Sequence, residues 1–290
     1  MCMKDYFEGE NAARIRFFHV CTDGKDNGVI YCSEKDYQRA ITITAILSHT
    51  LRVGIIAFCH MSTHSHFVIS CDSPDIAKKF IDSFKRDYSR YLFLDRGLTC
   101  AYRRSISEPK EIFDIFYLKN CISYVLLNPV SARISAAPET YRWSSFNAYF
   151  NEAPSDGTSI SSLSARNQRI ILKTHKHLAE SSIRIDSNGI PVLKSYVDFR
   201  FVENLFGSKT SFYKSLALTN IISEEEKYVP RLVRFSDNEL YAEALRLSKE
   251  RYNVSGIHFL TREQKLDIAN QLAHKTKVAS PRIFRVLKIQ

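Results

Sequence analysis

Short apolar runs and amphipathic segments alternate along the first 130 residues. Apolar or alternating runs bounded by turn residues are typical of strands, and they occur at residues 14–21, 53–59, 64–71 and 102–107. Apolar residues that recur every three or four positions predict helices over residues 33–50, 74–95 and 112–127. Ser33 and Pro74 are favourable helix starts, and Asn128 followed by Pro129 predicts the end of the third helix.

The predicted order is strand, helix, strand, strand, helix, strand, helix. Its first six elements match the split βαβ sandwich, in which helices cover one face of a four-stranded antiparallel sheet. We therefore predict an α+β fold, with a ferredoxin-like sheet of this type in residues 1–150. Residues 151–165 are rich in Ser, Gly and Pro and predict a linker. Residues 166–290 carry mainly helical signals and form a second predicted region.

The charge and the cysteine content of the chain favour a polyanionic partner and a cytoplasmic protein. The net charge is +10, and residues 246–290 alone hold ten bases and three acids, which favours a polyanionic partner. Seven cysteines without a Cys-x-x-Cys pair predict reduced, mostly buried thiols of a cytoplasmic protein. The first residues do not resemble a secretory signal, and no apolar run approaches the roughly 18 residues that a membrane span needs.

Two histidines, His64 and His66, are separated by one residue in a predicted strand. Alternation places both side chains on one face, with Cα atoms about 6.5–7 Å apart. Two imidazoles this close can bind one divalent ion, although surface histidines also pair by chance on strands.

Tyr124 and Asn128 are four residues apart in a predicted helix and are therefore neighbours on one face. If this face meets the two histidines, it supplies a nucleophile and a third, amide-oxygen metal ligand. The same spacing also fits a half-buried core tyrosine and an asparagine at a helix end.

Four blocks of the sequence resemble the single-strand DNA transposases of the HUH superfamily, in that family's order. Residues 61–69 resemble its Met-Pro-Asn-His-x-His segment, and residues 84–91 are similar to its next helix. Residues 124–133 resemble Tyr-Ile-x-x-Asn-Pro-Val-x-Ala-Gly, and residues 141–149 resemble Tyr-x-Trp-Ser-Ser-x-x-x-Tyr. The last two blocks are the most specific. They point to REP-associated tyrosine transposases or their insertion-sequence relatives, over residues 14–150.

This resemblance implies a transposase that nicks and rejoins single-stranded DNA, with hairpin-bearing ends, in the bacterial cytosol near the nucleoid. Tyr124 would attack a DNA phosphate and leave a 5′-phosphotyrosine and a free 3′-hydroxyl. His64, His66 and Asn128 would hold a metal ion, and this ligand set suits Mg²⁺ or Mn²⁺. The active site could be complete within one chain or need a homodimer.

The sequence departs from the family pattern beside and between the histidines. Ser62 and Thr63 replace the usual Pro-Asn, and Ser65 replaces a bulky apolar residue between the histidines. Ser65 should point into the core, where its hydroxyl needs a partner. These departures keep a second hypothesis open, namely a non-catalytic DNA-binding relative. A zinc hydrolase is a third idea, but the sequence shows no third ligand at an obvious spacing.

Several bases are candidate contacts to a DNA backbone: Lys85, Arg86, Arg90, Arg103 and Arg104. Tyr88 and Tyr91 lie among them, but their spacing favours the core side of a helix over base stacking. Residues 259–290 are similar to the helix-turn-helix tail of some of these transposases. The second tail helix could enter a DNA groove, or a partial helix-turn-helix could contact only the backbone.

Overall fold

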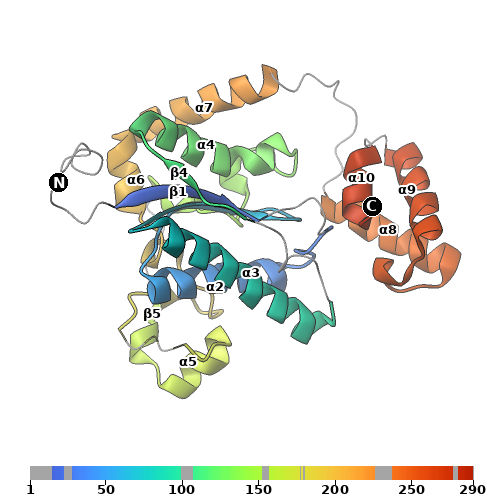
Figure 1. Ribbon diagram of the computed structural model, residues 1–290, viewed down its shortest axis with the longest axis horizontal. Coiled ribbons are helices and arrows are strands. Elements are labelled where there is room, and N and C mark those ends of the chain that lie inside the picture. Colours follow the sequence, from blue (N-terminus) through green and yellow to red (C-terminus); the bar gives the residue numbers. More distant parts are fainter. Residues whose placement is uncertain are drawn as a thin grey trace.

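The computed structural model has a four-stranded antiparallel sheet at its centre (Figure 1). The structure describes residues 15–22, 28–98, 107–151, 157–176, 178, 180–225, 237–276 and 280–289. The strands are β1 (Arg16–Cys21), β2 (Gly54–His60), β3 (Ser65–Cys71) and β4 (Lys110–Ile112), in the order β2-β3-β1-β4. This confirms the α+β class and the first three predicted strands to within two residues.

The fourth strand differs in position from the prediction. β4 pairs with Phe17, Phe18 and His19 of β1. The strand predicted at residues 102–107 lies outside the described residues except for Ser107, which is not in a strand. β4 is only three residues long and buries one side chain, so the sequence carries no alternating apolar pattern there.

Helices cover both faces of the sheet, which corrects the predicted arrangement with helices on one face. The helices between the strands are α2 (Glu34–Leu51) and α3 (Pro74–Arg96), and after β4 comes α4 (Ile115–Ser131). In β3, Phe67 packs on Phe80 and Phe84 of α3, whereas His66 meets Tyr124 of α4. Successive strand residues point to opposite faces, so α3 and α4 lie on opposite sides (Figure 1).

The helix starts follow from local capping. Ser33 forms a capping box with Asp36 at the start of α2, and Ser73 caps α3 ahead of Pro74. Helix α4 begins later than predicted, after the cap residue Asp114, and runs through Pro129 instead of stopping before it. Because the proline lies in the last turn, the helix loses only one backbone hydrogen bond.

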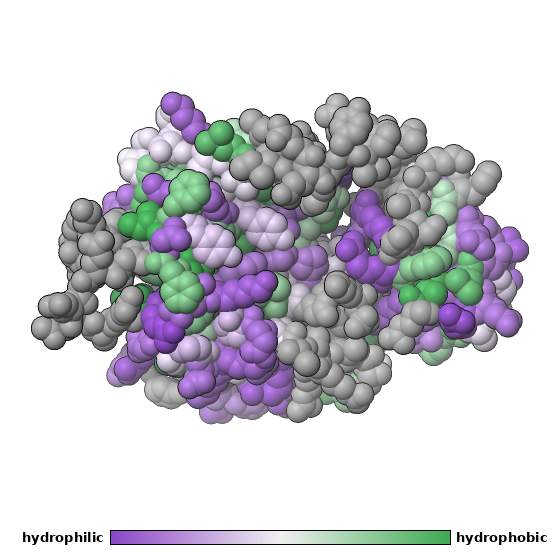
Figure 2. All heavy atoms as spheres, turned by 45° about the horizontal axis from the view of Figure 1, so that its top comes forward, coloured by the Kyte–Doolittle hydropathy of each residue, from purple (hydrophilic) through white to green (hydrophobic). Residues whose placement is uncertain are grey.

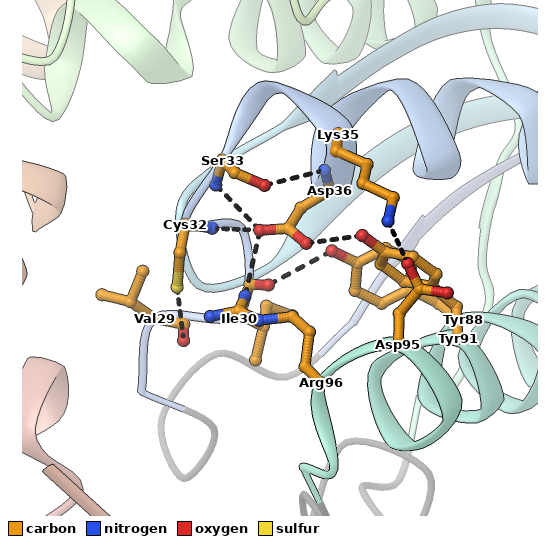
Figure 3. A network of polar contacts seen from close by, with 10 residues as sticks. All are labelled: Val29, Ile30, Cys32, Ser33, Lys35, Asp36, Tyr88, Tyr91, Asp95 and Arg96. Atoms are coloured by element: carbon orange, nitrogen blue, oxygen red, sulfur yellow. Dashed lines mark hydrogen bonds and ion pairs between the residues drawn. The ribbon is translucent and has the colours of Figure 1, made fainter. Parts of the chain in front are cut away.

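Asp36 has a second role in fixing the segment before α2 to α3 (Figure 3). Its side chain is fully buried and accepts hydrogen bonds from the backbone N–H groups of Cys32 and Ser33. From α3, Tyr91 donates to Asp36 at 2.8 Å and Arg96 at 3.0 Å. The network satisfies a buried carboxylate and anchors the chain that leads into α2.

The described residues form two large hydrophobic cores and one small buried cluster. The first contains the sheet and its helices and extends through Ile160 and Phe212. It includes residues of α6 (Phe199–Phe206) and α7 (Lys209–Glu225), and α5 (Ala165–Leu172) lies near the small strands β5 (Thr158–Ser159) and β6 (Arg184–Ile185). The second core belongs to α8 (Asp237–Tyr252), α9 (Arg262–Thr276) and α10 (Ser280–Leu287). The mainly helical C-terminal region is thus confirmed, and the domain boundaries at 151–165 stay a prediction.

The motif at residues 141–149 covers the outer edge of β2. Ser145 donates its backbone N–H to Phe58 at 3.0 Å and accepts from Phe58 N–H through its hydroxyl. The phenols of Tyr141 and Tyr149 donate to the carbonyls of His60 and Ile56, both at 2.6 Å. This block is therefore a structural cover for a strand edge.

Within the described ranges, no helix is long and apolar enough to cross a membrane. The described cysteines are free thiols. Cys59, Cys71 and Cys121 are buried as predicted, whereas Cys21 is exposed.

Candidate active site

The two motif histidines converge at the start of β3. His64 Nε2 and His66 Nε2 are 2.9 Å apart. Thr63 Oγ1 lies 2.9 Å from His64 Nδ1 and so leaves the other nitrogen of that ring directed at His66. Two nitrogen lone pairs at this distance repel each other unless a proton or a cation lies between them. The 2.9 Å separation fits either an N–H···N hydrogen bond or a cation shared by the two rings. Burial lowers the pKa of His66 well below 6.5, which keeps this ring neutral.

Tyr124 lies against His66, one member of this pair, as the resemblance implied and the spacing alone left open. Its ring centroid is 5.7 Å from that of His66, in an edge-to-face arrangement. The side chain is 47% exposed, so the phenol can meet a ligand from solvent. Partial burial raises the pKa of Tyr124, the neighbouring Cys21 adds to the shift, and the Asn128 side chain opposes it. The phenol therefore has to lose its proton before it can act as a nucleophile.

Asn128 is a neighbour of Tyr124 on α4, as predicted. Its Nδ2 donates to the backbone carbonyl of Tyr124 at 3.0 Å. In the described part of the chain, the hydrogen bond that its side chain forms is with Tyr124 and not with either histidine. Its role as a third metal ligand stays a prediction.

His19 is a member of this cluster that the sequence analysis missed. It lies on β1, and its ring stacks on His66 at 5.7 Å and meets Tyr124 edge-on at 6.0 Å. Its Nε2 is buried and has no hydrogen-bond partner within the described residues. Burial, with the charge of Lys110, lowers the pKa of His19 to about 4. Only the pairing of β1 with β3 brings His19 here, and one strand's sequence does not show that pairing.

The hydroxyls of Ser62 and Ser65 each have a defined partner. Ser65 is fully buried, and its Oγ lies 2.6 Å from the Tyr31 hydroxyl and 2.9 Å from His60 Nδ1. The expectation that Ser65 points into the core and needs a partner is confirmed. Ser62 Oγ donates to Asp237 at 2.8 Å. The replacements are therefore integrated into the fold around the histidines.

The chain matches no protein-family model, no curated protein and no solved structure.

The zinc-hydrolase hypothesis requires a cluster of metal-binding side chains. Among the described residues, no group of three or more His, Cys, Asp or Glu side chains is arranged to hold a metal ion. A zinc hydrolase needs three such ligands, so this idea gains no support.

The predicted DNA contacts on α3 lie across the sheet from Tyr124. Lys85 is only 2% exposed, and its Nζ pairs with Asp82 at 3.2 Å, which contradicts a backbone contact to DNA. Arg86 and Arg90 are exposed on α3, which packs on the face opposite α4. Arg103 and Arg104 lie outside the described residues.

Tyr88 and Tyr91 are structural, as their spacing predicted. Tyr88 is fully buried and its phenol donates to the Ile30 carbonyl at 3.2 Å. Tyr91 is 7% exposed and bonds Asp36. Neither ring presents a face for a nucleic-acid base.

Solvent-exposed aromatic side chains lie just before α4 and in its first turn, N-terminal to Tyr124. In Figure 2 this side of the molecule is turned forward, and hydrophobic side chains lie there among hydrophilic ones. The exposed rings of this segment are Phe113, Phe116 and Tyr117, which are 74%, 75% and 44% exposed. Lys110, in the neighbouring β4, is also exposed.

Proposed function

We propose that this protein is a metal-dependent tyrosine transposase of the HUH type. It would nick and rejoin single-stranded, hairpin-bearing DNA. The observation that carries the proposal is the contact of Tyr124 with His66, at 5.7 Å between ring centroids, beside two imidazole nitrogens 2.9 Å apart. A nucleophilic side chain and a metal-binding pair that meet from separate elements are what phosphoryl transfer through a covalent intermediate needs.

The fold supports the same proposal. The order β2-β3-β1-β4, with α2 and α3 each between two strands in the chain, is that of the ferredoxin-like split βαβ sheet. In this order β3 pairs with β1 and with β2, so His66 lies on a central strand that is hydrogen-bonded on both sides. Tyr124 of α4 packs against the His66 ring. Catalytic groups on rigid elements keep their geometry.

His64 and His66 would hold the divalent ion, Mg²⁺ or Mn²⁺, with the Asn128 amide as the third ligand. When bound, the ion would polarise the scissile phosphate and stabilise developing negative charge. The Tyr124 oxygen, after loss of its proton, attacks phosphorus. The bond from phosphorus to the 3′ oxygen breaks, leaving a 5′-phosphotyrosine and a 3′-hydroxyl. That hydroxyl, or one from another end, reverses the step and rejoins the strand.

Surroundings of Tyr124 favour a single strand as the substrate. Phe116 and Tyr117 expose aromatic rings on the same helix, and Phe113 exposes one just before it. Unpaired bases stack on such rings whatever their sequence. Lys110 adds a positive charge near His19. In a duplex the bases would be stacked on one another and unable to use these rings.

The C-terminal helices would form a partial helix-turn-helix. Helices α9 and α10 confirm the two helices expected after residue 259, and α8 completes their core. Residues 246–290 hold ten bases and three acids, so we assign this stretch an electrostatic role in holding DNA.

A non-catalytic DNA-binding relative is the second candidate. It is favoured by Asn128, whose side-chain hydrogen bond in the described part of the chain goes to the Tyr124 carbonyl and not to either histidine. Weak metal binding would then prevent the covalent step without affecting DNA binding.

The proposal is tested with labelled hairpin-bearing single strands and Mn²⁺. Wild-type protein should give a covalent protein–DNA adduct that survives denaturation in SDS. Tyr124→Phe keeps the ring and should abolish the adduct while DNA affinity stays unchanged. Tyr117→Phe is the matched control, because it removes a hydroxyl from another exposed tyrosine of α4 and should leave the adduct intact. Binding without any adduct would favour the non-catalytic relative.

A further inference from the structure

Asp237 is a buried carboxylate that joins two segments far apart in the sequence. It is the first residue of α8 and is 3% exposed. Its Oδ2 accepts a hydrogen bond from Ser62 Oγ at 2.8 Å. From α10, Arg282 Nε lies 2.7 Å from Oδ1 and an amino group of Arg285 lies 3.2 Å from Oδ2. One carboxylate thus links the C-terminal helices to the loop between β2 and β3.

Ser62 lies inside the turn that leads into the histidine pair. Met61 donates its backbone N–H to the His64 carbonyl at 2.7 Å and closes this turn. The Ser62 carbonyl accepts from the N–H groups of Ile30 and Tyr31, at 2.9 and 3.1 Å. The turn is therefore held on one side by residues 30–31 and on the other by Asp237.

Apolar contacts close the same junction. Val29, Leu240 and Val286 form a small buried cluster of their own, with one member from the segment before α2 and the others from α8 and α10. Because Asp237 is itself buried, its charge depends on Ser62 and the two arginines for compensation. Removing a partner of a buried charge is costly, so the link is firm.

We infer that Asp237 is a positioning residue for the His64–His66 pair. Through Ser62 it makes the geometry of the two imidazoles depend on the docking of α8 and α10. A proline at position 62, as in the family pattern, has no hydroxyl and could not form this link. The inference rests on the proposed function only in treating the two histidines as a metal site.

The first test is the affinity for Mn²⁺, measured by titration calorimetry on the full chain. Ser62→Ala removes the hydroxyl and leaves both arginines on Asp237, so α8 and α10 keep their contacts. Loss of such outer-shell support typically weakens metal binding by about 10- to 100-fold, and we expect a loss of that size. Asp237→Asn should act in the same direction.

Glu243→Gln is the matched control. Glu243 is another α8 carboxylate with two cationic partners, Arg246 and Lys275, both at 2.6 Å, but the structure gives it no bond to the histidine loop. Its loss should leave Mn²⁺ affinity unchanged. Equal losses in this variant and in Ser62→Ala would mean that general destabilisation, not positioning, is responsible and would overturn the inference.

A second readout needs neither metal nor DNA. The imidazole ¹H–¹⁵N signals of His64 and His66 should shift in Ser62→Ala and stay in place in Glu243→Gln. If Ser62→Ala has unchanged imidazole signals and the same Mn²⁺ affinity as the wild type, the inference is overturned. If the wild type binds no Mn²⁺, the imidazole signals alone decide. Shifted signals in a protein that forms no DNA adduct would uphold the positioning role and count against the proposed function.

Discussion

The two faces of the sheet differ in what packs against the side chains of β3 and in how far solvent can reach those contacts. On the α3 face, Phe67 of β3 is enclosed by Phe80 and Phe84 and is fully buried. On the α4 face, the preceding residue, His66, meets a half-exposed Tyr124. One face is thus a closed aromatic core, and the other has polar rings at a place that solvent can reach.

The tyrosines of the two helices show what this difference means. Tyr88 on α3 is fully buried and its phenol is bonded to a backbone carbonyl. Tyr124 on α4 is 47% exposed and lies beside two histidines. A buried, bonded phenol fixes the packing of a core, whereas an exposed phenol beside histidine rings is available for chemistry. Stability and function are therefore assigned to opposite faces.

The largest expected effect is on stability at the closed face. Phe67→Ala should lower the free energy of unfolding by about 3–5 kcal/mol, because a fully buried ring leaves a cavity. Tyr124→Ala, on the open face, should lower it by about 1 kcal/mol or less. Urea unfolding of both variants measures the contrast, and equal losses would contradict the division between the faces.

A pH effect should follow from His60 on the closed face. Burial lowers the pKa of His60 to about 3, from 6.5 in an unfolded chain. Between these two pH values His60 is protonated in the unfolded chain but neutral in the folded protein. The contribution of His60 to the free energy of unfolding is therefore fully present above pH 6.5 and is lost as the pH falls towards 3. One histidine contributes a slope of about 1.4 kcal/mol per pH unit.

Unfolding measured by urea at pH 7 and pH 5 checks this effect. His60→Phe removes the titrating group and should flatten the dependence by that amount. The same slope in wild type and variant would show that His60 does not remain neutral in the folded protein.

The smallest expected effect concerns DNA affinity. Lys110→Gln removes a charge near the open face and should reduce the slope of log affinity against log salt by about 0.7 for a single strand. Arg86→Gln removes a charge from α3, across the sheet, and should change the slope less. Fluorescence anisotropy over a salt series compares the two variants, and a larger change in the Arg86 variant would reverse the assignment of the faces.

Much of the fold could be predicted because its signals are local. Ser33 and Ser73 are cap residues directly before amphipathic runs, and the strands that became β1, β2 and β3 have apolar runs bounded by breaks. The nearly unbroken apolar run of β2 is itself typical of a strand buried on both faces, which is the signal that the one-face prediction overlooked.

The site was only partly predictable because several of its contacts are long-range. Spacing could place His64 beside His66 and Tyr124 beside Asn128, since each pair lies within one element. His19 joins them only through the pairing of β1 with β3, and Asp237 reaches Ser62 across 175 positions. No local pattern in the sequence encodes either contact.

We expect the oxygen of Tyr124 to become covalently bonded to DNA. The most direct measurement is to trap the adduct on a labelled hairpin strand with Mn²⁺, digest the protein and DNA, and locate the nucleotide remnant by mass spectrometry. The account predicts a 5′-nucleotide on the peptide that contains Tyr124 and none on the peptide that contains Tyr213, another exposed tyrosine. A remnant on any residue other than Tyr124 would contradict it.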